Sequence, residues 1–308
     1  MYEEKQGPIE ELLHLYVDGA FSRRELIRRL AVYTGGVAGA IAALSGLNLA
    51  RAQDASSSCP AKVPADAEDL NVSDIEFAGE DSPVFGHLAF PKMDAGKKLP
   101  GVIVIHENRG LLDHIKDVTR RAARANFVAL GVDLLSRQGG TQQFPEPTQQ
   151  AAAYRQTSAE GRLSDLISGV RYLQSLDFVE SDRIGAVGFC AGGGEVWNLA
   201  VNLEELAAAV PFYGSPVPTE EQIARIKSPL LGIYAERDRN LTLRTAPVIT
   251  ALLTQLKTFG FHIYEGVGHA FHNDTGPAYD STAACDAWSR TVAWFNKFLR
   301  KPEDQPAA

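Results

Sequence analysis

Cys190 has the sequence surroundings of a catalytic nucleophile. It lies between Gly188 and Gly192, after the apolar run Ile184–Val187 and before a helical pattern that starts near Glu195. The Gly-x-Cys-x-Gly spacing on a strand, turn and helix is that of a nucleophile elbow, where serine is commoner. A helix that begins just after the cysteine directs backbone N–H groups and its positive dipole end at the sulfur, which favours a thiolate. The segment therefore predicts nucleophilic thiol chemistry.

Two later residues could complete a catalytic triad with this thiol. Asp238 follows the apolar run Leu230–Tyr234, and His269 follows Phe261–Tyr264. A nucleophile of this kind needs a base and the base needs an orienting acid, which in an α/β-hydrolase sheet follow it in the order acid, then histidine. All three residues come after strands, and ligands of open α/β sheets bind at the carboxyl ends of the strands. We therefore predict a triad of Cys190, Asp238 and His269.

Each of these residues also has an alternative explanation. Glycines after a strand can form a phosphate loop or a tight turn, and a free cysteine is most often a small buried apolar residue. An aspartate after a strand is usually a turn or capping residue, and seven histidines occur in the chain. His269, His272 and Asp274 could instead hold a metal. The required order at one sheet edge favours the triad, so no metal site is predicted.

Apolar runs and helix-length segments alternate along the chain, which predicts an α/β fold with a mostly parallel sheet and helices on both faces. The first expected strand alternates in polarity, which is typical of an antiparallel edge strand. The expected strands are 84–90, 101–105, 127–132, 184–187, 207–212, 230–234 and 261–264. The expected helices are 113–125, 148–176, 195–201, 220–226, 245–256 and 279–299.

Several motifs together resemble the dienelactone hydrolase (carboxymethylenebutenolidase) family, which has the α/β-hydrolase fold. The resemblance extends from about Ser73 to Leu299. Its most specific part is the elbow, because cysteine at that position separates the family from most α/β-hydrolases. The matching segments are Gly188–Gly194, Glu236–Asp238, Gly268–Asp274, His106–Gly110 and Pro211–Gly214.

The resemblance implies a catalytic role for four residues. Cys190 would be the nucleophile, His269 the base and Asp238 the residue that orients it. Glu107 matches a family glutamate that contacts the resting nucleophile and helps it to ionise. A carboxylate near the thiol can take or share its proton, although Glu107 could also be a loop residue in an ion pair with Arg109.

The resemblance also implies an oxyanion hole and a substrate site. The backbone N–H groups of Ala191 and Asn108 would bind the oxyanion. Arg137 matches an arginine that binds the substrate carboxylate, a task that suits a bidentate guanidinium, although it could be a solvated loop charge. Tyr213 belongs to a family segment and is expected at the substrate site.

One position departs from the family. Just past His269 the dienelactone enzymes have a second carboxylate-binding arginine, and here that position is Asn273. We expect Asn273 and His272 at the substrate site, but His272 could replace the missing charge only if protonated. An anionic dienelactone should therefore bind less tightly.

The composition excludes several classes of partner. The formal net charge is −8, and no Lys- or Arg-rich run follows residue 52, so neither nucleic acid nor an anionic membrane surface is an expected partner. No nucleotide-binding motif is visible and no cofactor is predicted. Three cysteines occur, Cys59, Cys190 and Cys285. In an exported protein Cys59 and Cys285 could pair and leave Cys190 free.

The N-terminal residues resemble a twin-arginine export leader. Arg23 and Arg24 precede a weakly hydrophobic, uncharged stretch, and Ala50-Arg51-Ala52 has the small-x-small pattern of a cleavage site. We expect a leader over residues 1–52, a linker over 53–71, the hydrolase domain over 72–300 and a flexible tail over 301–308. This organisation predicts a periplasmic protein with no stable membrane span after processing. The alternatives are a cytoplasmic protein with an N-terminal helical arm and a retained membrane anchor.

The sequence thus predicts a hydrolase in which a cysteine opens lactones or activated esters through an acyl-enzyme. A broader esterase or thioesterase with the same triad is one alternative. A non-catalytic ligand-binding protein that keeps the fold is another. The substrate itself and the oligomeric state do not follow from the residues.

Overall fold

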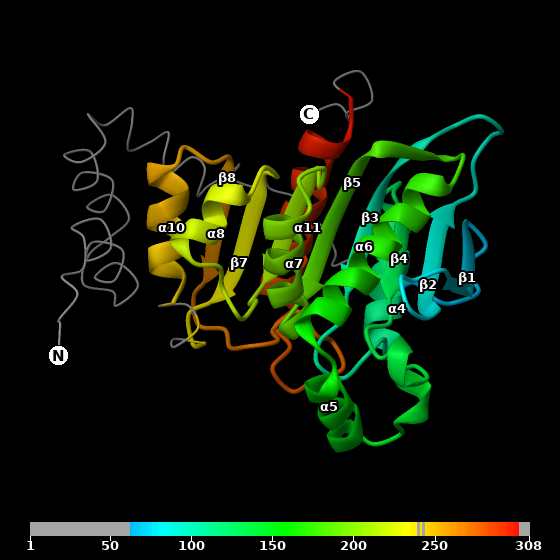
Figure 1. The fold of residues 1–308 in the computed structure, drawn as a ribbon, viewed down its shortest axis with the longest axis horizontal. Coiled ribbons are helices and arrows are strands. Elements are labelled where there is room, and N and C mark those ends of the chain that lie inside the picture. The colour runs from blue at the N-terminus through cyan, green and yellow to red at the C-terminus, as the bar shows by residue number, and fades with distance from the viewer. Residues whose placement is uncertain (1–61, 239–240, 242–243, 302–308) are drawn as a thin grey trace.

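The computed structural model describes residues 62–238, 241 and 244–301 as one central sheet with helices on both faces (Figure 1). The strands are β1 (Leu70–Phe77), β2 (Val84–Pro91), β3 (Leu99–Ile105), β4 (Val128–Val132), β5 (Val179–Phe189), β6 (Ala208–Phe212), β7 (Leu230–Ala235) and β8 (Phe259–Tyr264). The helices are α4 (Asp113–Arg124), α5 (Pro147–Gln156), α6 (Ala159–Ser175), α7 (Ala191–Asn202), α8 (Glu220–Arg225), α10 (Thr245–Thr254) and α11 (Ser281–Leu299). Two short 3₁₀ turns, η1 (Ser136–Gln138) and η2 (Thr141–Gln143), follow β4.

The strand order β1-β2-β4-β3-β5-β6-β7-β8 is that of an α/β-hydrolase fold. Strands β3 to β8 run parallel to one another, whereas β1 and β2 are antiparallel additions at one side. The predicted α/β architecture with a mostly parallel sheet is therefore confirmed. Because the carboxyl ends of parallel strands meet at one edge, the loops after β3, β5, β7 and β8 converge there.

Helices α6 and α7 cover one face of the sheet, and α4 and α11 cover the other (Figure 1). Residues of β5 that point to opposite faces of the sheet show this directly. A Cβ on Gly188 would meet Val196 of α7, whereas one on Gly185 would meet Phe295 and Leu299 of α11. The strands between these layers are buried on both faces, which is why they read as continuous apolar runs.

Two expected elements differ in the structure. The strand expected at the sheet edge, now β2, lies between β1 and β4, so its edge position was wrong. The strand β1 outside it escaped notice because only its two end residues, Leu70 and Phe77, are buried and the sequence between them is largely polar. The structure also starts earlier than the expected domain boundary at residue 72, since Val63 is buried.

The helix expected over 148–176 is two helices. Thr157 and Ser158 both have extended backbone conformations, which end α5 and start α6. The Ser158 side chain accepts a hydrogen bond from the Gly161 N–H at 3.0 Å and so caps α6.

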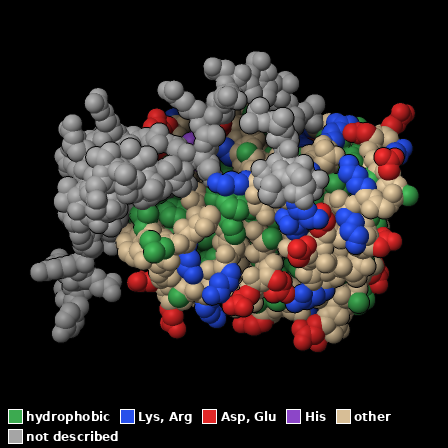
Figure 2. Space-filling model, turned by 90° about the horizontal axis from the view of Figure 1, so that it is seen from above, with side chains coloured by type: hydrophobic (Ala, Val, Ile, Leu, Met, Phe, Trp, Pro, Cys, Tyr) green, Lys and Arg blue, Asp and Glu red, His purple; other side chains and the backbone are tan. Residues whose placement is uncertain are grey.

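The predicted leader, residues 53–61 of the linker, Cys59 and residues 302–308 of the tail lie outside the described residues. Those expectations and the pairing of Cys59 with Cys285 therefore stay predictions. On the face shown in Figure 2, acidic and basic side chains are interspersed over the surface that is not covered. No helix among the described residues combines the length and apolarity needed to cross a membrane.

Candidate active site

Cys190 lies at the sharp turn between β5 and α7. Its backbone has φ 56° and ψ −117°, a region that residues with a Cβ seldom adopt, and its N–H donates to the Phe212 carbonyl at 3.1 Å. The flanking glycines permit this turn. A Cβ on Gly188 would lie 2.3 Å from the Gly192 carbonyl oxygen, and one on Gly192 would lie 2.4 Å from the Ile105 carbonyl oxygen. The elbow geometry expected from the spacing is present, and its half-buried cysteine is a free thiol.

The start of α7 and the loop after β3 offer two free backbone donors. Among the described residues, the N–H groups of Ala191 and Asn108 have no hydrogen-bond acceptor. Ala191 is the first residue of α7, where backbone N–H groups have no partner within the helix. Asn108 follows Glu107 in the loop after β3, and the elbow packs against the end of that strand through Gly192. The arrangement suits a pair of donors for a developing oxyanion.

His269 interacts with both of the other triad candidates. Its Nδ1 lies 2.5 Å from Asp238 Oδ2, which joins the loops after β7 and β8. A hydrogen bond with Cys190, reinforced by the negative charges of Cys190 and Asp238, raises the pKa of His269 to about 9 despite partial burial. The structure thus brings Cys190, Asp238 and His269 together, with the imidazole in the middle.

Glu107 lies beside this group with one oxygen unpaired. Its Oε2 accepts a hydrogen bond from Asn273 Nδ2 at 2.8 Å, while Oε1 is buried without a partner among the described residues. No ion pair with Arg109 forms, so that explanation of Glu107 is wrong. Burial and the neighbouring charges of Glu107 and Cys190 raise the pKa of the buried Tyr213 hydroxyl, which places Tyr213 close to both.

Asn273 holds Glu107 and is itself held in place. Besides donating to Glu107, its side-chain oxygen accepts hydrogen bonds from the Thr275 backbone N–H at 3.0 Å and from the Thr275 hydroxyl at 2.7 Å. Asn273 is only 6% exposed. A neutral amide therefore orients the glutamate here, where the family resemblance places an arginine.

Arg137, expected to bind a substrate carboxylate, is engaged in ion pairs with two carboxylates of the chain. Its guanidinium pairs with Asp165 of α6 at 2.9 Å and with Asp81 at 3.1 Å. The side-chain hydrogen bond with Asp165 is the main reason that the pKa of Arg137 is raised. Binding a substrate carboxylate would require these contacts to break and would leave the buried Asp165 without its cation. The geometry does not favour Arg137 as a substrate ligand.

His272 also differs from its expected role. Its ring is 1% exposed and stacks on Phe189 with centroids 4.8 Å apart. Desolvation lowers the pKa of His272 well below the ordinary value, with further repulsion from His114 and Arg121. A neutral ring inside an aromatic cluster cannot supply the positive charge missing at position 273.

A cavity of about 530 Å³ opens beside Glu107, between the loop after β3, the start of α4 and η2. Glu107 and Asn273 line it, together with Arg109, Gln142 and Gln150. Arg109 is half-buried and makes no ion pair with any described residue. The sequence placed Arg109 in a family segment, but only the structure shows that its guanidinium borders this cavity.

The residues of the alternative metal site do not converge. His269 binds Asp238, Asp274 binds His114 at 2.9 Å, and both nitrogens of His272 are without partners in the described part of the chain. Within residues 62–238, 241 and 244–301, no group of three or more His, Cys, Asp or Glu side chains is arranged to hold a metal ion.

Comparisons with known proteins agree with this fold. Residues 85–299 match the dienelactone hydrolase family. A Saccharolobus solfataricus protein named "Putative carboxymethylenebutenolidase" is 32% identical over 235 residues, which cover 65% of this chain and 88% of that protein. A Methylorubrum extorquens protein of the same name is 29% identical over 247 residues, which cover 77% of this chain and 84% of that protein.

A solved structure supports the same assignment. The crystal structure of the "Putative Dienelactone Hydrolase" of Klebsiella pneumoniae superposes with a TM-score of 0.68 and is 26% identical. The superposition covers 74% of this chain and 99% of that one. The chain belongs to the dienelactone hydrolase family and is a hydrolase that acts on ester or lactone bonds.

Proposed function

We propose that Cys190 is the nucleophile of this hydrolase and opens lactones or activated esters through an acyl-enzyme. The observation that carries the proposal is the position of His269, which interacts with the Cys190 thiol on one side and with Asp238 on the other. A raised pKa keeps the imidazole protonated at neutral pH. We propose that this imidazolium and the start of α7 favour the thiolate form of Cys190. The thiolate is the reactive form of a cysteine.

The reaction follows from this charge distribution. The Cys190 sulfur attacks the carbonyl carbon, and the N–H groups of Ala191 and Asn108 receive the oxyanion. When the tetrahedral intermediate collapses, the C–O bond breaks and the leaving oxygen takes the proton of His269. The neutral imidazole then removes a proton from water, which attacks the thioester, and the departing thiolate restores the ion pair with the protonated ring.

The nature of the nucleophile restricts the substrates. A thiolate leaves a tetrahedral intermediate more readily than an alkoxide does, so the intermediate of a plain alkyl ester reverts to starting material. An enolate or phenolate competes better as a leaving group. Enol lactones and aryl esters are therefore better substrates than alkyl esters or peptides.

Glu107 assists ionisation in this scheme. Its Oε1 is a buried acceptor with no partner in the described residues, and Asn273 fixes the carboxylate through the other oxygen. We propose that Oε1 accepts the thiol proton when the cysteine is in its neutral form.

The thiolate can be tested without knowledge of the substrate. Alkylation of Cys190 by iodoacetamide, located by mass spectrometry, is expected to be nearly as fast at pH 6 as at pH 8. An ordinary thiol with a pKa of about 8.5 would slow by about 75-fold over that interval. A slowing of that size for Cys190 would contradict the proposal and favour a non-catalytic ligand-binding protein.

Arg109 provides a test of substrate charge, with Arg137 as the matched control. If the carboxylate of an anionic dienelactone lies in the cavity beside Glu107, Arg109→Gln should raise KM for that lactone by about 10-fold, the value of one charge-assisted contact. Hydrolysis of neutral nitrophenyl acetate should be unchanged within about twofold. Arg137→Gln is expected to affect both substrates equally, because its guanidinium pairs with Asp165 and Asp81.

The same measurements separate the two enzymatic alternatives. A wild-type preference for the anionic lactone that Arg109→Gln removes supports a dienelactone hydrolase activity. If the wild type hydrolyses neutral esters as fast as the anionic lactone, and Arg109→Gln affects neither substrate, the enzyme is the broader esterase with the same triad.

A further inference from the structure

The loop that carries His269 has no regular secondary structure and depends on contacts with other parts of the fold for its position. It connects β8 to α11 and spans residues 265–280. Its first part is tied to the loop of Asp238, since the Gly266 N–H donates to Glu236 at 2.8 Å and the Arg237 N–H donates to the Val267 carbonyl at 2.9 Å. Its second part is tied elsewhere, through Asp274.

Asp274 fastens the second part of the loop to α4. Its carboxylate accepts hydrogen bonds from His114 Nδ1 at 2.9 Å and from Arg121 Nη2 at 2.8 Å, both of which belong to α4. The side chain is 9% exposed. These partners, His114 first, lower the pKa of Asp274 far below the ordinary value, so the carboxylate is charged throughout the working pH range.

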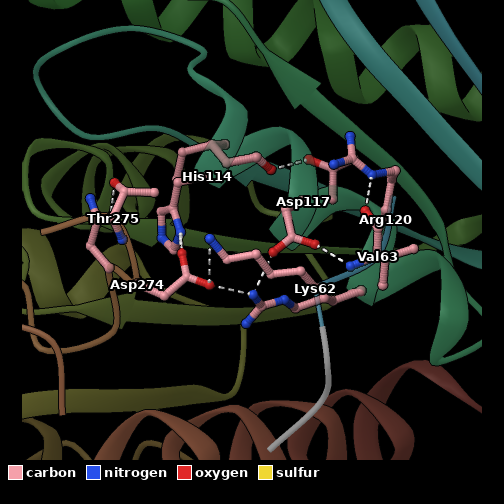
Figure 3. A network of polar contacts seen from close by, with 11 residues as sticks. Lys62, Val63, His114, Asp117, Arg120, Asp274 and Thr275 are labelled. Carbon is pink, nitrogen blue, oxygen red and sulfur yellow. Dashed lines mark hydrogen bonds and ion pairs between the residues drawn. The ribbon is translucent and has the colours of Figure 1, made fainter. Parts of the chain in front are cut away.

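The anchor on α4 is itself rigidly held (Figure 3). Arg121 also pairs with Asp117, whose other oxygen accepts the Val63 N–H at 2.6 Å. Arg120 donates to the Val63 carbonyl at 2.6 Å, and the Lys62 ammonium lies 3.7 Å from Asp274. The helix thus joins the segment before β1 to the loop after β8, and it packs on β2 and β4.

We propose that Asp274 is a positioning residue that sets the location of His269 and Asn273 relative to Cys190 and Glu107. It adjoins Asn273, which orients Glu107, and it lies five residues after His269 on the same irregular loop. Without the carboxylate, the segment keeps its contacts to the Glu236–Asp238 loop, the hydrogen bond of Asn273 with Glu107 and the packing of Phe271 and His272, but it loses its tie to α4. Displacements of about 1 Å can cost a large factor in rate. This inference rests on the proposed roles of Cys190 and His269.

Asp274→Asn in the full chain tests the proposal, because it keeps the size of the side chain and removes its charge. We expect kcat on nitrophenyl acetate to fall by about 10-fold with KM changed less than about threefold. The pH profile of Cys190 alkylation should also move toward that of an ordinary thiol, because a displaced imidazolium stabilises the thiolate less. Asp69→Asn is the control, since Asp69 pairs with Arg124 of the same helix at the exposed surface and should leave both measurements unchanged.

A folded Asp274→Asn variant with the wild-type kcat and alkylation profile would overturn the proposal, and so would equal effects of the two substitutions. If Asp274→Asn does not fold, His114→Gln is the second variant, because it removes one of the two hydrogen bonds that Asp274 accepts from α4. It must shift the pH profile of Cys190 alkylation toward that of an ordinary thiol. An ordinary thiol profile in the wild-type protein would instead show that the proposed function has failed.

Discussion

Cys190→Ala is expected to lower the rate of lactone and ester hydrolysis by at least about 10⁴-fold, because loss of a covalent nucleophile in comparable triads has effects of this order or larger. The oxyanion donors and the cavity remain in the variant, so substrate binding should persist. Alanine has a Cβ like cysteine and places no new atom at the strained φ of 56°, so the fold should be retained. Hydrolysis of nitrophenyl acetate by the purified variant, with circular dichroism as the folding control, checks this.

Cys190→Ala also tests the proposed ion pair between the Cys190 thiolate and the His269 imidazolium. A hydrogen bond with Cys190 is the largest cause of the raised pKa of His269, so its removal should lower that pKa from about 9. NMR titration of the His269 ring in the two proteins measures the change. Full activity of Cys190→Ala would end the proposal that a thiolate carries the chemistry. An unchanged His269 titration would show that Asp238 alone sets its charge.

The sequence was sufficient to predict the fold and the meeting of Cys190, Asp238 and His269 at one sheet edge, because both follow from local patterns. Strands buried on both faces read as continuous apolar runs, and the carboxyl ends of parallel strands share one edge of the sheet. Residues that follow β5, β7 and β8 therefore had to converge, wherever the helices packed. The glycines around Cys190 were also informative, since the close approach of Gly192 to Ile105 leaves no room for a side chain.

The contacts around Cys190, Asp238 and His269 could not be predicted, because they join residues that lie far apart in the sequence. Glu107 and Asn273 are 166 residues apart and meet only because two loops fold over the same sheet edge. Arg137 pairs with Asp165, which is buried on α6, and nothing in the helical pattern marks that carboxylate as its partner. His272 precedes the polar residues Asn273–Thr275, yet aromatic neighbours from β5 and β6 enclose it.

These pairings change what the family resemblance implies for the substrate. Arg137, expected to bind a carboxylate, is occupied, and position 273 carries an amide that binds Glu107. Two cations line the cavity beside Glu107: Lys116, which pairs with Asp74, and Arg109, which makes no ion pair with a described residue. For an anionic substrate, this arrangement favours entry from the side of the β3–α4 loop over entry from the side of α6.

Asp238→Asn is expected to lower kcat by about 10³-fold or more while leaving the thiol in place, as removal of the acid does in other triads. The carboxylate accepts the Nδ1 proton of His269 at 2.5 Å and holds the ring with its other nitrogen toward Cys190. An asparagine can donate to Nδ1 and so stabilise the wrong tautomer.

The pH dependence provides the sharper test of this variant. In the wild type the imidazolium loses its proton as the pH rises through about 9, so kcat/KM should fall on the alkaline side near that value. Removing the negative charge of Asp238 lowers the pKa of His269, and the alkaline limb must therefore move to lower pH. Steady-state hydrolysis of a neutral aryl ester between pH 6 and pH 10 measures both limbs. A variant with an unchanged alkaline limb and undiminished kcat would show that Asp238 does not act on His269, and the triad would reduce to a cysteine and a histidine.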